Sequence, residues 1–238
     1  MIPLKADNPT EIKPIVTIEF IVACVLVFLY QVSLQAKLGE IFVYQYGAIP
    51  AVVFGYADLP PELVAIPAYS SLMTSMFLHG GWMHLIGNMM YLWIFGNNIE
   101  DVMGHVKFVV FYVLCGLLAA LSHAAIDFGS TVPMVGASGA ISGILGAYIL
   151  LYPRARVLVL IPFGFFSQMI YIPAGIVLGL WFLMQLFSGG MSIGNEGGGV
   201  AFFAHIGGFV AGMALIPFFK HSHVKFFNPP QYHPQSWR

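Results

Sequence analysis

The sequence predicts an all-α membrane protein, a bundle of six transmembrane helices with both termini on the cytoplasmic side. Composition, the number of apolar runs and the distribution of positive charge lead to this prediction. Hydrophobic residues make up 59% of the 238-residue chain and charged residues only 8%, whereas about 25% of a soluble domain is charged. The mean hydropathy is +0.85, and several runs approach the roughly 20 apolar residues that cross about 30 Å of hydrocarbon.

The chain divides into a polar N-terminal lead, a membrane domain and a polar, Pro-rich tail that we expect to be disordered; these are residues 1–14, 15–219 and 220–238. We read the first apolar run as a retained span rather than a signal peptide. The six expected spans cover residues 15–31, 80–96, 106–124, 138–151, 169–187 and 200–219. The apolar run 157–187 is too long for one crossing, and Pro162 and Gly164 are expected to break it.

Two loops have unusual compositions. Residues 32–79 are too apolar for a solvated loop, so we expect them to fold into short helices at the membrane interface. Residues 188–199 contain six glycines, which predicts a mobile loop.

Charge then orients the bundle. Six spans place both termini on one side, and if that side is cytoplasmic, Lys37 is the only cation outside among the nine Lys and Arg residues. Cytoplasmic loops of membrane proteins carry an excess of Lys and Arg, so the distribution supports both the span count and the orientation.

The formal net charge of −1 gives no basic surface for nucleic acid. The two cysteines, Cys24 and Cys115, are interpreted as apolar packing residues.

Four polar side chains are expected at a similar depth below the outer surface. His84 and His205 each lie about five residues into a span that enters from outside, which is roughly 8 Å at 1.5 Å per residue. Asn88 shares a helix face with His84 because it follows four residues later. Ser138 begins another span that enters from the same side. Polar residues within the membrane mark functional sites by default.

Small residues at four-residue intervals allow two of these helices to approach closely: Gly139, Gly143 and Ala147 on one, and Ala204, Gly208 and Gly212 on the other. Such faces let helix backbones touch. Packing them together would bring the Ser138 hydroxyl within hydrogen-bond reach of His205, the minimum for a base-activated nucleophile. The Ser138 N–H lies at a helix start, where backbone donors have no partner and negative charge is favoured. His84 and Asn88 could add donors to an oxyanion site.

Each of these residues also has a structural explanation. Gly-Ala-Ser-Gly occurs in packing faces, His205 could be a satisfied core histidine, and Asn88 could join two helices by a hydrogen bond. Ser142 is interpreted as a packing residue. Metal binding by His79, His84 and His205 is a further alternative, although the sequence lacks a His-Glu-x-x-His motif, so we expect no metal or other cofactor.

The sequence resembles the rhomboid intramembrane serine proteases over roughly residues 70–215. The resemblance rests on four motifs in order: residues 79–88 (HGGWMHLIGN), Glu100 with Gly104, residues 136–139 (GASG) and residues 204–208 (AHIGG). It implies a six-helix bundle, a Ser138–His205 dyad without a third acid, and an oxyanion and substrate-binding site that includes Gly136, Ser138, His84 and Asn88. It also implies water access from the outer face and a gate for substrate formed by residues 188–199 and the fifth span. Some members place an aromatic residue four positions after the serine, stacked on the histidine, where this chain has Ser142.

The resemblance implies an endopeptidase that cuts single-span or polytopic membrane proteins in or near their transmembrane segments. Its partners would be those substrates and the lipid bilayer. Because the sequence shows no extra domains or targeting segments, we expect its location to be the inner membrane of a bacterium. Two other functions stay open at this point. One is a non-catalytic client-binding or adaptor protein on the same fold. The other is a transporter, which the absence of an evident internal repeat disfavours.

Overall fold

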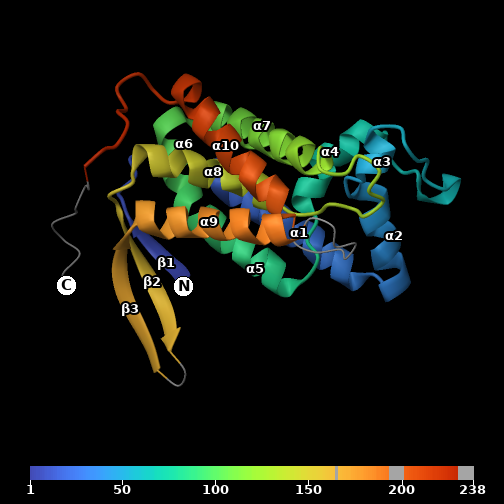
Figure 1. Ribbon diagram of the computed structural model, residues 1–238, viewed down its shortest axis with the longest axis horizontal. Coiled ribbons are helices and arrows are strands. Elements are labelled where there is room, and N and C mark those ends of the chain that lie inside the picture. The colour runs from blue at the N-terminus through green and yellow to red at the C-terminus, as the bar shows by residue number, and fades with distance from the viewer. Residues whose placement is uncertain (164–165, 193–200, 230–238) are drawn as a thin grey trace.

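The computed structural model describes residues 1–163, 166–192 and 201–229 and is mostly helical (Figure 1). Four helices are long and apolar enough to cross a membrane. They are α1 (Ile15–Ser33), α7 (His105–Ala124), α9 (Ala174–Ser192) and α10 (Phe202–Phe219). Much of their surface is exposed and apolar, as lipid contact requires. The protein is therefore an integral membrane protein with four candidate spans among the described residues.

A shorter apolar helix, α8 (Ser138–Leu151), packs against α7 and α10 and has 14 residues, nearly all of them buried. Its glycines make this packing possible. A Cβ atom on Gly146 or Gly212 would collide with the backbone of the facing helix, at Phe209 and Gly143 respectively. The predicted small-residue packing of these two segments is thus present, with glycine required because the backbones themselves are in contact.

The region predicted as the second span is one continuous helical run in three parts. These are α5 (Trp82–Tyr91), a π-helical turn (Leu92–Gly96) and α6 (Asn97–Met103). Together they extend for about 33 Å at 1.5 Å per residue. A π-helical turn within an α-helix shifts the faces of the two halves relative to each other.

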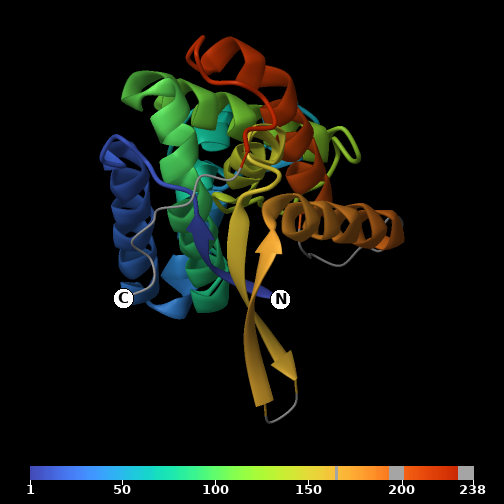
Figure 2. The ribbon, with the colours of Figure 1, turned by 90° about the vertical axis from the view of Figure 1, so that its left-hand side faces the viewer.

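The prediction of an all-α protein is wrong in one region. A three-stranded antiparallel sheet of order β1-β2-β3 lies at the end of the bundle where α8 ends (Figures 1 and 2). Its strands are β1 (Ile2–Asp7), β2 (Arg156–Phe163) and β3 (Phe166–Pro173). The N-terminal lead therefore contains a strand, which pairs with β2 from Ile2 opposite Leu160 to Asp7 opposite Arg156.

The presence of β3 also means that the predicted fifth span, residues 169–187, began too early. Residues 169–173 belong to β3, and α9 begins at Ala174 and continues to Ser192, into the segment predicted as a mobile loop. The rest of that loop, residues 193–200, lies outside the described residues. Alternation explains β2, because Val157 and Val159 are fully buried while Leu158 and Leu160 are only partly buried.

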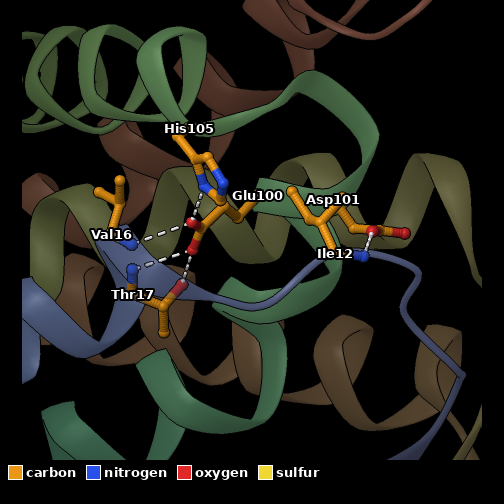
Figure 3. Close-up of polar contacts among 6 residues, drawn as sticks. All are labelled: Ile12, Val16, Thr17, Glu100, Asp101 and His105. Carbon is orange, nitrogen blue, oxygen red and sulfur yellow. Dashed lines mark hydrogen bonds and ion pairs between the residues drawn. The ribbon is translucent and has the colours of Figure 1, made fainter.

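Two neighbouring acids on α6 hold the start of the chain in place (Figure 3). The buried Glu100 carboxylate accepts hydrogen bonds from the backbone N–H groups of Val16 and Thr17, both at 2.9 Å, and from the Thr17 hydroxyl at 2.7 Å. His105 Nδ1 lies 2.6 Å from the same carboxylate. Asp101 accepts from the N–H of Ile12 at 2.8 Å. Glu100 thereby satisfies N–H groups at the first turn of α1 that have no partner within the helix.

The long loop between α1 and α5 folds into short helices, as predicted. The α-helical segments are α2 (Ala36–Tyr46), α3 (Pro50–Val53) and α4 (Ser71–Thr74). The first part of the tail is packed rather than free, since the N–H of His221 donates to the Val102 carbonyl and the N–H of Phe227 to the Leu150 carbonyl, at 2.8 and 2.9 Å. Residues 230–238 of the predicted disordered tail lie outside the described residues.

Candidate active site

Ser138 is the first residue of α8, and the segment before it is held by backbone hydrogen bonds. Met134 and Ala48 exchange two of them, at 2.8 and 3.0 Å, and the N–H of Gly136 donates to the Ser75 carbonyl at 2.8 Å. Gly136 has a φ of +123°, a conformation that favours glycine. Because its N–H is already bonded to Ser75, Gly136 shapes the backbone next to Ser138 and offers no free amide donor.

His84 lies directly against Gly136. A Cβ atom on Gly136 would be 2.7 and 2.8 Å from the Cε1 and Nε2 atoms of His84, and 3.7 Å from the Ser138 hydroxyl oxygen. The His84 ring and the Ser138 hydroxyl therefore border the same glycine, from α5 and α8 respectively. A side chain at position 136 would displace the imidazole.

One hydrogen bond assigns the tautomer of His84. The N–H of Gly80 donates to His84 Nδ1 at 3.2 Å, so Nδ1 is an acceptor without a hydrogen. In a neutral imidazole the other nitrogen then carries the hydrogen. Nε2–H is consequently a donor located beside Gly136 and Ser138.

Asn88 supplies a second unused donor. It lies one turn after His84 on α5, is 7% exposed, and its side-chain Nδ2 is buried with no hydrogen-bond partner within the described part of the chain. Buried donors are nearly always satisfied, and leaving one unpaired costs about 1–3 kcal/mol. A donor kept in this state suits a site where a ligand oxygen provides the missing acceptor.

His205 lies in the first turn of α10 and is 9% exposed. Its Nδ1 atom is 2.8 Å from Oε1 of Gln185, and its ring centroid is 5.8 Å from that of Trp181. The start of α10 packs against the start of α8, where a Cβ on Gly139 would be 3.9 Å from the carbonyl oxygen of Ala204. The helices that carry Ser138 and His205 are thus adjacent, although no hydrogen bond joins those two side chains among the residues that the structure describes.

A small cavity of about 40 Å³ adjoins Ser138. It is bordered by the 134–136 segment, the start of α8, α7, and Ala201 and Ala204 near the start of α10. This volume accommodates one water molecule or slightly more. Hydrolysis requires a water molecule at the reacting serine, and this cavity has room for one.

The sequence interpretation missed Gln185 and Trp181, which contact His205 from α9. Gln185 could have been noticed as a polar residue inside a predicted span, but no pattern in the sequence connects it to His205.

The metal alternative involves His79, whose ring centroid lies 5.3 Å from that of His84. Over the described ranges, no three His, Cys, Asp or Glu side chains are grouped closely enough to hold a metal ion.

The part of the chain that contains this site matches a known family in sequence. The Rhomboid domain matches residues 67–222, more than half of the chain, and the protein belongs to this family. The chain is 31% identical over 161 residues to Rhomboid protease GluP of Bacillus subtilis, covering 68% of this chain and 28% of that protein. It is 28% identical over 166 residues to Rhomboid protease GlpG of Haemophilus influenzae, covering 67% of this chain and 78% of that protein.

A plant relative, RHOMBOID-like protein 5 of Arabidopsis thaliana, is 37% identical over 78 residues, which cover 33% of this chain and 25% of that protein. The chain thus spans well under half the length of two of these three relatives. All four predicted motifs lie within the matched domain, which includes Ser138 and His205.

Proposed function

We propose that this protein is an intramembrane serine endopeptidase in which Ser138 is the nucleophile and His205 the general base. The observation that carries the proposal is the state of the two histidines near Ser138. The Nδ1 atoms of both rings are engaged, by Gly80 in one case and Gln185 in the other. His84 is left with a donor at Nε2 and His205 with an acceptor there, which are the two roles that acyl transfer needs.

The proposed reaction has two steps. The Ser138 oxygen attacks the scissile carbonyl carbon while its proton passes to His205 Nε2, and the same proton then passes to the leaving amine as the peptide bond breaks. Water hydrolyses the resulting ester with His205 again accepting and returning a proton. The tetrahedral oxyanion accepts hydrogen bonds from the Ser138 N–H, His84 Nε2–H and Asn88 Nδ2–H. The hydroxyl and His205 must come closer than in this structure, and catalytic hydrogen bonds commonly tighten when substrate binds.

We further propose six membrane spans with both termini in the cytoplasm. The continuous run from α5 to α6 and the central helix α8 would add two spans to the four long helices. A 14-residue helix is about 21 Å long, less than the roughly 30 Å of the hydrocarbon layer. Burying both ends of α8 would therefore place Ser138 below the outer surface, next to the cavity that can hold water.

The proposed substrates are single-span or polytopic membrane proteins cut in or near a transmembrane segment, reached through the bilayer. A helical peptide bond is shielded by its own hydrogen bonding, so segments that unwind easily are expected to be preferred. A bacterial inner membrane remains our proposed location, and the relatives include mitochondrial proteins of eukaryotes as well as bacterial proteins.

The test is reconstitution in liposomes with a single-span substrate that carries small residues near its outer end. Wild type is compared with Ser138→Ala and with a matched control, Ser142→Ala, which removes a hydroxyl one turn further along α8 that donates to the Ser138 carbonyl at 2.6 Å. We expect product from wild type and Ser142→Ala only. Product from Ser138→Ala would overturn the proposal.

A serine-directed fluorophosphonate resolves the case in which no variant yields product. Labelling of wild type but not of Ser138→Ala supports an activated serine and points to an unsuitable substrate. Absence of labelling overturns the protease proposal and favours a non-catalytic protein that binds membrane clients.

A further inference from the structure

The side chain of Gln185 is a polar group in an apolar helix, and it turns inward. Its neighbours on α9 point outward, since Met184 is 59% exposed, Leu186 43% and Phe187 71%. Gln185 is only partly exposed, and its Oε1 lies 2.8 Å from Nδ1 of His205 on α10. Figure 1 shows α9 alongside α8 and α10, so the contact joins two neighbouring helices. A polar side chain in such a helix is costly unless it has a partner.

Trp181 lies one helical turn before Gln185 on the same face of α9. Its ring centroid is 5.8 Å from that of His205, with an angle of 38° between the planes. The same indole packs against Phe209, one turn after His205 on α10. His205 is therefore held by two side chains of α9, one by ring packing and the other by a hydrogen bond.

The chemistry of the amide oxygen determines which nitrogen of His205 can act as a base. An amide oxygen only accepts hydrogen bonds, so the hydrogen of the neutral imidazole resides on Nδ1. Nε2 then has a free lone pair. When Nε2 takes a proton, the Nδ1–H bond to Gln185 becomes charge-assisted and shortens, while the amide itself neither gains nor loses a proton.

We propose that Gln185 is a positioning residue for His205, which fixes its tautomer and ring orientation so that Nε2 faces the nucleophile. The inference rests on the proposed function, and it assigns to a neutral amide on α9 the task that a carboxylate performs in three-residue serine protease sites. Trp181 restricts the ring to the plane in which this hydrogen bond forms. The aromatic contact to the histidine thus comes from α9, while α8 has Ser142 one turn after the nucleophile.

The test compares Gln185→Leu, which removes the acceptor, with Gln185→Glu, which keeps an acceptor oxygen. Gln185→Leu should lower kcat about 10- to 100-fold, the range typical when the partner that fixes a functional imidazole is lost, with little change in KM. Gln185→Glu should restore kcat to within a few-fold of wild type. The control is Gln31→Leu, which removes another partly buried amide, whose Nε2 donates to the His79 carbonyl at 2.9 Å.

Two results would overturn the inference. One is an unchanged kcat in Gln185→Leu. The other is an equal loss in Gln185→Leu and Gln185→Glu, which would indicate a packing role only. The rate of Ser138 labelling by a fluorophosphonate should follow kcat across the variants.

A readout independent of activity separates this inference from the proposed function. The ¹⁵N shifts of labelled His205, assigned by comparison with His205→Ala, report which ring nitrogen carries hydrogen. We expect hydrogen on Nδ1 in wild type and Gln185→Glu, and a mixture of tautomers in Gln185→Leu. Absence of fluorophosphonate labelling at Ser138 in every protein, wild type included, would overturn the proposed function, whereas a tautomer that does not respond to Gln185→Leu would overturn the positioning role even in an active enzyme.

Discussion

Gly212 on α10 and Gly143 on α8 are in backbone contact, because a Cβ atom on Gly212 would overlap the Gly143 carbonyl. Gly212→Ala should therefore push the two helices apart and lower the free energy of unfolding by about 1–3 kcal/mol, the usual cost of overpacking. It should also reduce proteolysis, since the same helix pair carries Ser138 and His205. Thermal unfolding in detergent and cleavage assays provide the measurements.

Gly179→Ala is the matched control for Gly212→Ala. Gly179 is also helical, on α9, and a Cβ atom there would meet nothing within 4 Å. Replacing glycine by alanine in an unobstructed helix stabilises it by up to about 1 kcal/mol. Equal effects of the two substitutions would contradict the close approach of α8 and α10.

Glu100→Gln should destabilise the protein by about 2–4 kcal/mol, because an NH₂ group would face donors that now have a carboxylate oxygen as acceptor. The donors concerned are the N–H groups of Val16 and Thr17, the Thr17 hydroxyl and His105. Chemical unfolding in detergent measures the change. Asp101→Asn makes the same chemical change at the next residue, which is less buried, and should cost less than about 1 kcal/mol; a larger loss at Asp101 would contradict the assignment.

Gly136→Ala should lower kcat by at least about 100-fold, comparable to the loss of an oxyanion donor, since the new methyl would displace His84 from its place beside Ser138. Gly55→Ala separates strain from displacement, because Gly55 also has a positive φ, +75°, but open space where a Cβ would be. Both variants should lose some stability, measured by thermal unfolding. Only Gly136→Ala should lose cleavage, and normal turnover in that variant would argue against an oxyanion role for His84.

His79 gives the protein a pH-dependent stability. Burial, with a smaller contribution from the charge of His84, lowers the pKa of His79 to about 4 from its ordinary value of 6.5. The unfolded chain therefore takes up this proton more readily than the folded protein, and stability falls as the pH decreases from about 6.5 to about 4. The full change is about 3 kcal/mol. Unfolding measured between pH 4 and pH 7 should show a weaker dependence in His79→Asn, and an identical slope in both proteins would refute this contribution.

Composition and hydropathy were sufficient to predict the membrane class and the principal helices, because lipid exposure requires long apolar segments. The contact between the small-residue faces that include Gly143 and Gly212 could also be predicted from the sequence, because helices whose backbones touch need glycine at the point of contact. The sheet was missed. In an apolar run such as 157–173, a strand and a broken span have the same composition, and pairing with residues 2–7 depends on partners distant in sequence.

The proposed site, too, could be predicted from the sequence only in part. Ser138, His84, Asn88 and His205 stood out as polar groups at a similar depth in apolar segments, and their placement on α5, α8 and α10 is now described. The tautomers could not be predicted, because they depend on Gly80 and Gln185, whose hydrogen bonds arise only from three-dimensional packing.

The pairing of β1 with β2 also constrains the order in which the parts of the protein fold. Ile2 is synthesised before α1, but its partner Leu160 emerges only after α1 through α8 have left the ribosome. Contacts between such distant positions form late, because a long loop must close first. Residues 2–7 must therefore stay unpaired at the membrane surface while most of the helices insert. The sheet then joins them to residues 156–160 once that insertion is well advanced.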